Sequence, residues 1–189
     1  RNQLAARMEA GATRVDVLGT LPGATQLEGS DLQMVARGRN LARLFDFLGI
    51  VIPPTRTYRF TSDLTKVGEE WRFTHLKGRF GDSDLAGRFT VSQPGGRTLI
   101  KGDLATQKLD IIDVGPFIGY DPEKLASQGA GGAIETVSGT PRVLPDTPLR
   151  VEAIRNFDAD VRYSVKTVRA PNVPISNAAV TVKLDKSLL

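Results

Sequence analysis

A single histidine, His75, is the side chain in this sequence best suited to act as a general base near neutral pH. Catalysis would also need an orienting acid and a nucleophile close to it, and the surrounding run WRFTHL (residues 71–76) marks neither. The sequence has no cysteine, which excludes a thiol nucleophile, a disulfide framework and a thiolate zinc site. We therefore expect His75 to be a surface or cross-strand residue, and we expect no catalytic residue.

Oxygen ligands for a metal ion are clustered at Asp82, Ser83 and Asp84, between two glycines. A calcium loop needs several further oxygen donors at fixed spacing, usually closed by a bidentate glutamate, and that glutamate is absent here. Aspartates in a turn bond nearby backbone amides, which explains the cluster better. We expect neither a metal ion nor a cofactor.

A second carboxylate pair, Asp158 and Asp160, falls on one side of an alternating segment, so paired-carboxylate chemistry is geometrically allowed. Arg162 and Lys166 continue along the same side. This mixture of opposite charges is typical of a solvated strand face with cross-strand ion pairs. We favour that interpretation over a catalytic one.

The overall charge gives little indication of a partner. The chain has 189 residues with 25 Lys+Arg and 21 Asp+Glu, a formal net charge of +4. The basic residues are scattered and form no run of the length that tracks a nucleic acid backbone, so we expect no nucleic acid partner. No apolar run approaches the roughly 18 residues that span a bilayer. Because the chain begins without Met or a signal sequence, we interpret it as a fragment of a longer protein.

Residues 31–48 are predicted to form the one substantial helix. Ser30 could cap it, and Gly49 followed by two prolines could end it. The apolar residues of this stretch fall roughly at helical spacing: Leu32, Val35, Leu41, Leu44, Phe45 and Leu48.

Alternating apolar and polar residues predict strands in most of the remaining chain. One covers residues 13–18, four consecutive strands between 58 and 106 form a meander, and two more cover 157–166 and 175–184. Residues 1–120 are thus a helix plus an antiparallel meander. Residues 121–148, with a glycine-rich stretch that lacks the Gly-Lys-Ser/Thr of a phosphate loop, are a mobile linker or long loop. Residues 149–189 are further strands continuing the same sheet. The predicted fold class is mainly β (α+β), with a curved, largely antiparallel sheet.

The alternation places a set of large apolar residues on one side of that sheet: Tyr58, Phe60, Phe73, Phe89, Val91, Val161, Tyr163 and Val165. They could form a core covered by the 31–48 helix or by a second sheet. They could also line a hydrophobic groove that holds acyl chains. One helix of roughly five turns is little to cover six or more strands, which would leave apolar surface exposed.

Five short motifs follow one another between residues 29 and 114. They are G-x-D-L (29–32), P-x-T (53–55), G-x-x-G-x-S-D-L-x-G (78–87), G-x-L (102–104) and L-D-x-x-D-V (109–114). A related pattern restarts after a variable linker, with Leu144-Pro145, Leu149, Ile154 and residues 157–161. In this order the motifs resemble the AsmA family of bacterial envelope proteins, over most of the chain from residue 29 onward.

The resemblance implies a function that the spacing of the residues does not show. AsmA-like proteins are anchored in the inner membrane by an N-terminal helix, lie in the periplasm, and resemble bridge-like lipid transfer proteins. By this resemblance the chain is a non-catalytic periplasmic segment of a Gram-negative bacterium that holds or guides phospholipid along a hydrophobic β-groove between the inner and outer membranes. Its partners would be phospholipid or another acyl lipid, the membrane through an anchor outside this chain, and neighbouring segments of the parent. The alternative is a structural or interaction module that pairs through exposed strand edges without lipid.

Overall fold

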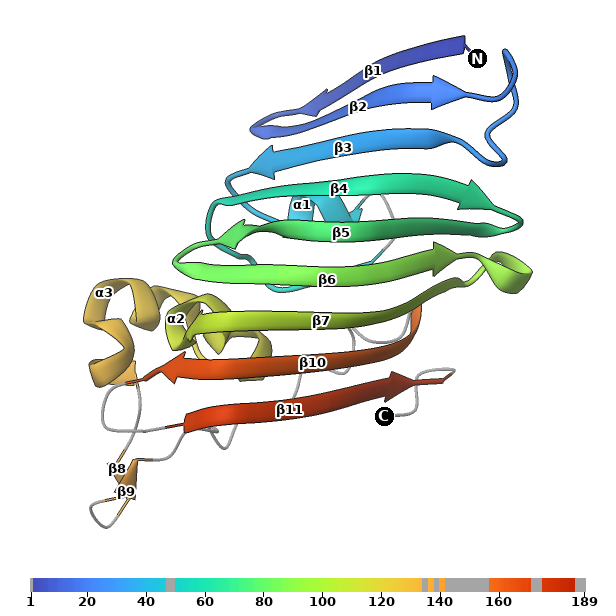
Figure 1. Cartoon of the computed structure of the whole chain (residues 1–189). Helices are drawn as coiled ribbons and strands as arrows, with labels where there is room; N and C mark the ends of the chain where they lie inside the picture. Colours follow the sequence, from blue (N-terminus) through green and yellow to red (C-terminus); the bar gives the residue numbers. More distant parts are fainter. Residues whose placement is uncertain are drawn as a thin grey trace.

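One broad sheet forms most of the molecule (Figure 1). A computed structural model describes residues 2–46, 50–133, 136–137, 140–141, 157–170 and 175–185. The strands of the large sheet are β1 (Asn2–Ala10), β2 (Thr13–Leu21), β3 (Asp31–Gly38), β4 (Tyr58–Val67), β5 (Glu70–Phe80), β6 (Ser83–Ser92), β7 (Thr98–Asp110), β10 (Phe157–Arg169) and β11 (Ile175–Leu184). They lie side by side in chain order, and every neighbouring pair is antiparallel except β7 and β10, which are parallel.

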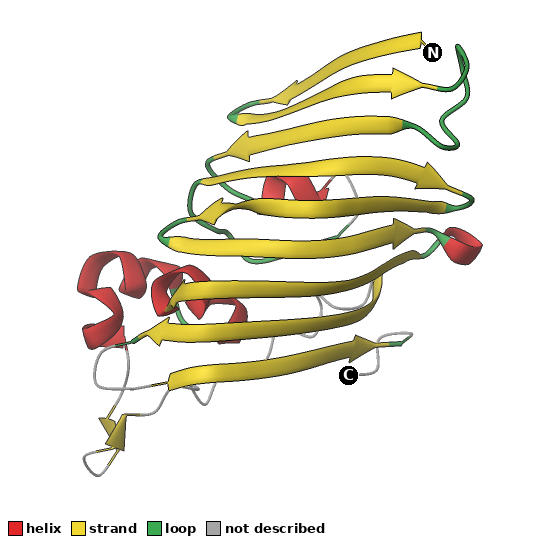
Figure 2. Ribbon diagram, in the orientation of Figure 1, coloured by secondary structure: helices red, strands yellow, loops and turns green. Residues whose placement is uncertain are grey.

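The helical elements are short and lie outside this sheet, as Figure 2 shows. They are α1 (Ala42–Asp46), η1 (Pro94–Gly96), α2 (Ile111–Val114), η2 (Gly115–Ile118) and α3 (Pro122–Ala133). A separate two-stranded ribbon pairs β8 (Thr136–Val137) with β9 (Thr140–Pro141). The prediction of a mainly β, largely antiparallel fold is confirmed. The sheet twists gently and is not strongly curled, so the predicted curvature is not seen (Figure 1).

The predicted helix over residues 31–48 is wrong. The structure has strand β3 from Asp31 to Gly38 and only the five-residue α1 after it, while residues 47–49 lie outside the described residues. Ser30 does not cap a helix, because its hydroxyl accepts a hydrogen bond from the Lys66 amide at 3.2 Å. Leu32 and Ala36 are buried on one side of β3, and pairing with β2 and β4 outweighs the helical spacing of its apolar residues.

The interval predicted to be a linker or long loop, residues 121–148, begins with a helix. Helix α3 covers Pro122–Ala133 and is kinked at Gly129, whose φ is 67°. Leu125 on this helix is buried with Ile111 and Tyr120 in a small cluster beside the end of β7. Except for β8 and β9, the rest of this interval lies outside the described residues. Strands β10 and β11 are the last two strands of the large sheet.

His75 marks a β-bulge in β5. Its φ is +51°, and the pairing of β5 with both neighbouring strands changes register close to it. The imidazole is 79% exposed, and its Nδ1 lies 2.8 Å from the Asp63 carboxylate. The extra residue lets Phe73 before the bulge and Leu76 after it face the same side of the sheet. The expectation of a surface, cross-strand histidine is confirmed.

A buried carboxylate, Asp113, fastens the β5–β6 turn to the end of β7. Its side chain is 0% exposed. One carboxylate oxygen accepts hydrogen bonds from the amides of Asp82 and Ser83 at 2.9 Å and from the Ser83 hydroxyl at 2.6 Å. The other accepts from the Arg56 guanidinium at 3.1 Å. The Ser83 hydroxyl in turn accepts from the Asp110 amide at 2.9 Å, so three separate segments meet at one side chain.

The motif residues around this carboxylate have structural roles. Gly81 has a φ of +56°, and a Cβ there would collide with the Asp113 carboxylate. The Asp84 carboxylate accepts hydrogen bonds from the Gln107 amide at 2.9 Å and the Lys108 amide at 2.7 Å. The oxygens considered for calcium therefore accept from protein donors, although the donors to Asp84 lie on β7 and not in the turn itself.

We expect Asp113→Ala to lower the free energy of unfolding by about 3 kcal/mol, because it leaves buried amides and the Arg56 guanidinium without their acceptor. Urea denaturation measures this value. Asp160→Ala is the matched control, because the Asp160 side chain is exposed and makes no hydrogen bond or ion pair within the described ranges. Its effect should stay within about 0.5 kcal/mol. Equal losses in the two variants would contradict the role given to Asp113.

Candidate lipid-binding face

All eight predicted groove residues lie on the same side of the large sheet. Residues paired directly across two strands point to the same side. Phe73 is opposite Phe89, and a chain of such pairs continues from one strand to the next. These pairs, together with the alternation along each strand, place eight residues on one side of the sheet: Tyr58, Phe60, Phe73, Phe89, Val91, Val161, Tyr163 and Val165. We call this side the apolar face and the opposite side the polar face.

The eight residues differ in how much of each is accessible. Four are buried, with exposures of 4–7%: Tyr58, Phe60, Val91 and Val165. The other four are partly exposed: Phe73, Phe89, Val161 and Tyr163. Leu41 and Leu44, from α1 and the residue before it, pack against the central cluster, and so does Val114 of α2. The middle of the apolar face is therefore a packed core, with partly open side chains around it.

The partly exposed side chains are held in defined positions. Phe73 and Phe89 stack with ring centroids 4.4 Å apart and an interplanar angle of 7°. Tyr163 is fixed by a 2.8 Å hydrogen bond between its hydroxyl and the Thr106 hydroxyl. These contacts give the apolar face rigid aromatic surface next to its core.

The apolar face continues to both edges of the sheet, where its side chains meet solvent. Met8 on β1 is 44% exposed. On β11, Val180 and Val182 are 54% and 37% exposed, and they lie opposite Tyr163 and Val161. The sequence analysis did not assign these three residues to the face. The alternation in 175–184 could have identified the valines, whereas β1 is rich in alanine and gives only a weak signal.

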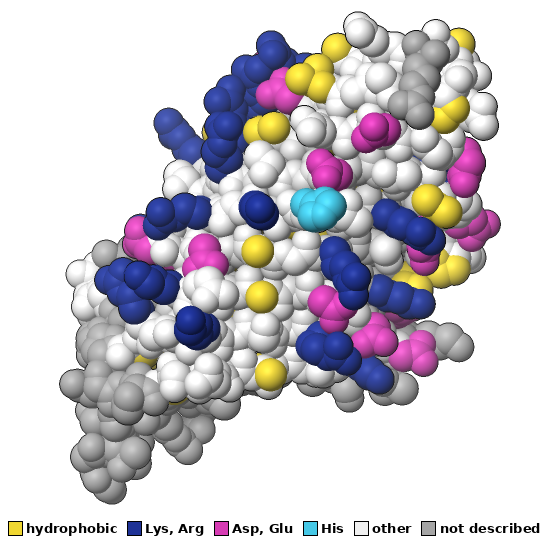
Figure 3. All heavy atoms as spheres, viewed as in Figure 1, with side chains coloured by type: hydrophobic (Ala, Val, Ile, Leu, Met, Phe, Trp, Pro, Cys, Tyr) yellow, Lys and Arg dark blue, Asp and Glu magenta, His cyan; other side chains and the backbone are white. Residues whose placement is uncertain are grey.

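The polar face carries interleaved charges, as the space-filling view in Figure 3 shows. Asp103 on β7 accepts from Arg88 of β6 and from Arg162 of β10, each at 3.2 Å. Asp158 pairs with Arg97 at 2.7 Å. The ion-pair interpretation of the Asp158 region is confirmed by this contact.

The fold defines an open β-sheet scaffold with one apolar and one polar face. Compared with curated proteins, the chain is 26% identical over 192 aligned positions to the AsmA family protein YhjG of Escherichia coli (strain K12), covering 96% of this chain. The chain is thus a distant homologue of an AsmA family protein along nearly its whole length, which confirms the resemblance of the motifs. It spans only 28% of the length of that relative.

The other comparisons found no counterpart. No family model and no solved structure matches the chain. In the part of the chain that the structure describes, no helix is long and apolar enough to cross a membrane.

Burial gives the tyrosines of the apolar face a measurable pH dependence. It raises the pKa of Tyr58 and of Tyr163 above the ordinary value of 10.0, and the hydroxyls of Thr13 and Thr106 oppose this by less. The unfolded chain therefore loses these protons first as the pH rises above about 10, so stability falls there. We expect Tyr58→Phe/Tyr163→Phe to reduce this alkaline loss, measured by urea denaturation from about pH 8 to about pH 11. An unchanged slope would contradict the assignment.

Proposed function

We propose that this chain is a non-catalytic periplasmic segment of an AsmA-like protein, and that its apolar face holds or guides phospholipid acyl chains between the inner and outer membranes. The observation that carries the proposal is an apolar face that extends across the sheet and stays exposed at both edges. Distant homology to an AsmA family protein supports the same role.

The mechanism is passive. Each methylene group of an acyl chain gains about 0.8 kcal/mol when it leaves water for an apolar surface. The surface available for this contact includes Phe73, Phe89 and Tyr163 next to the core, and Val180 and Val182 at the β11 edge. The buried residues Tyr58, Phe60, Val91 and Val165 support this surface from within the core. The phosphate headgroup stays in water, so no covalent step is needed.

The parent protein supplies the rest of the pathway. The chain spans 28% of its relative, and both β1 and β11 are edge strands of the sheet. We propose that neighbouring segments of the parent continue the sheet at these edges and extend the apolar face. Attachment to the inner membrane, through an anchor elsewhere in the parent, completes the proposal.

A second candidate function is a structural module that pairs through its strand edges without lipid. In β1, eight of nine residues are exposed, and an edge of this length is a template for another strand. This alternative needs the backbone of the edge, whereas the lipid proposal needs the apolar side chains.

The lipid proposal is tested by native mass spectrometry of the purified chain and by uptake of a fluorescent fatty acid. We expect bound phospholipid in the wild type and reduced uptake in Val180→Asp/Val182→Asp, because charge on the apolar face opposes acyl contact. The control is Ala179→Asp/Thr181→Asp, which adds the same charge to the polar face of the same strand.

Three outcomes decide the lipid proposal. Loss of uptake confined to the valine variant supports it. Equal loss in both variants, or no lipid and no uptake in the wild type, contradicts it.

The edge-pairing alternative is tested by sedimentation velocity of delipidated protein over a range of concentrations. It predicts association that grows with concentration and falls in Gln3→Lys/Ala5→Lys, which charges the β1 edge on the polar side and leaves the apolar face unchanged, since charged side chains on an edge strand oppose pairing. A chain that stays monomeric throughout would contradict it.

A further inference from the structure

Four arginines form a row across four adjacent strands of the polar face. Arg14 on β2 is paired with Arg37 on β3, Arg37 with Arg59 on β4, and Arg59 with Arg79 on β5. Directly opposed side chains lie about 5 Å apart at Cβ, and like charges in this position destabilise a sheet. We call these four residues the arginine row.

Nearby carboxylates neutralise the positive charge of some arginines in the row more than that of others. Arg14 pairs with Asp16 at 2.7 Å and with Glu9 at 3.7 Å. Asp16 also pairs with Arg7, and these two arginines lower its pKa to about 2, the larger part from Arg14, so it is ionised under ordinary conditions.

The remaining members of the row have far less compensation. The Arg79 guanidinium donates to the Asp82 backbone carbonyl at 3.4 Å, contributes a little to the lowered pKa of the Asp82 carboxylate, and is paired opposite Asp84. Within the described residues, neither the Arg37 side chain nor the Arg59 side chain makes a hydrogen bond or an ion pair. Two exposed, directly opposed guanidinium groups are therefore left without an acidic partner.

This arrangement differs from the rest of the polar face. Between β6 and β10 the arginines alternate with an acid, because Arg88 and Arg162 share Asp103. In the arginine row no carboxylate separates one guanidinium from the next across three consecutive strand pairs. Such a row is favoured when an anion lies against it.

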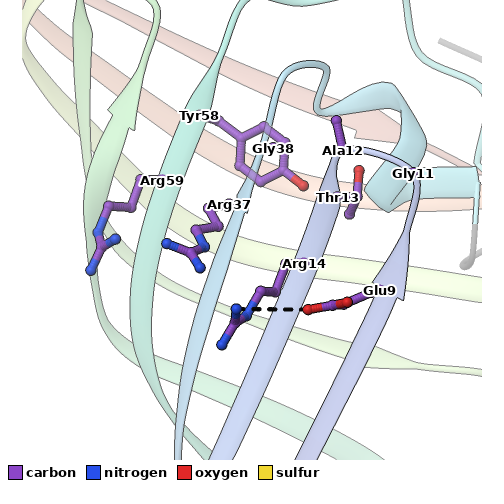
Figure 4. Close-up of a pocket in the computed structure, with 9 residues that line it drawn as sticks. All are labelled: Glu9, Gly11, Ala12, Thr13, Arg14, Arg37, Gly38, Tyr58 and Arg59. Carbon is purple, nitrogen blue, oxygen red and sulfur yellow. Dashed lines mark ion pairs between the residues drawn. The ribbon is translucent and has the colours of Figure 1, made fainter.

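A cavity of about 510 Å³ lies at this end of the strands. Figure 4 shows Arg14, Arg37 and Arg59 side by side, each from a different strand. The site thus offers three guanidinium groups from three adjacent strands.

We propose that Arg37 and Arg59, flanked by Arg14 and Arg79, bind a phosphate-bearing anion. The planar guanidinium fork matches phosphate oxygens in a bidentate manner, and two adjacent forks match an anion with at least two negative charges. The phosphate could belong to a phospholipid headgroup or to a soluble phosphate. The proposal does not rest on acyl binding, because the row lies on the polar face.

The test uses the 189-residue chain and two probes. Isothermal titration calorimetry measures binding of pyrophosphate, and flotation measures binding to phosphatidylcholine vesicles with and without phosphatidylglycerol. We expect Arg37→Gln/Arg59→Gln to weaken binding by about tenfold or more. The control is Arg88→Gln/Arg162→Gln, which removes the same charge from the same face but from arginines that already have an acidic partner.

A second measurement separates binding from folding. In low salt and without ligand, Arg37→Gln/Arg59→Gln should melt at the same temperature as the wild type or higher, because like-charge repulsion is relieved. Pyrophosphate should raise the melting temperature of the wild type and of the control, but not of this variant.

The outcomes separate the two phosphate sources. Selective loss of pyrophosphate binding alone supports a site for a soluble phosphate, and selective loss of vesicle binding supports a headgroup site. Equal weakening in both double variants would show diffuse charge attraction and overturn the proposal. Absence of wild-type binding to both probes would also overturn it, whatever the result of the fatty-acid experiment.

Discussion

The alternation of side chains across the large sheet is the constraint on which the rest of the structure depends. One face stays apolar only if the alternation keeps its phase from strand to strand, because a slip of one residue would turn a whole strand over. The bulge at His75 preserves this phase in β5, between Phe73 and Leu76. Further along β7, Thr106 and Leu109 are both buried although they are three residues apart. Their partners on β10, Val165 and Val168, are also three residues apart, so the two strands keep the same phase. His75 therefore has a structural role, because the bulge at this residue keeps the apolar side chains of β5 on one face of the sheet.

The motifs that carry the family resemblance belong to the scaffold rather than to the accessible surface. Asp113, Ser83 and Gly81 form one buried contact, and Asp84 holds the β7 backbone by two amides. These residues fix where β6, β7 and α2 meet. Most of the accessible side chains of the apolar face, such as Phe73, Val180 and Val182, lie outside these motifs. This separation explains why an AsmA-like sequence can be recognised by its turns while its proposed binding surface cannot.

The sequence predicted the fold where strong β-formers alternate and where turns are marked by glycine. The segments from Tyr58 to Thr106, and the strand with Val161 and Val165, are of this kind. Prediction failed at β3, where Met34 and Ala36 are poor strand signals and Ser30 resembles a helix cap. It missed β1, whose alanines give no preference for a strand and which is held by pairing with β2.

The candidate site was predictable only in part. Alternation identified the face of all eight predicted residues, but not which of them are buried, since that depends on how α1 and α2 pack against the sheet. The arginine row was not predicted either, because its members are far apart in the sequence and only the register of four strands aligns them.

The central claim is that acyl chains lie on the apolar face. Its most direct test is photocrosslinking of the purified chain with a phospholipid that carries a diazirine on its acyl chain, followed by peptide mapping. The account predicts labels on accessible residues of that face, such as Met8, Phe73, Val180 and Val182. Labels centred on the exposed polar-face residue Leu18, or equal labelling of both faces, would contradict it.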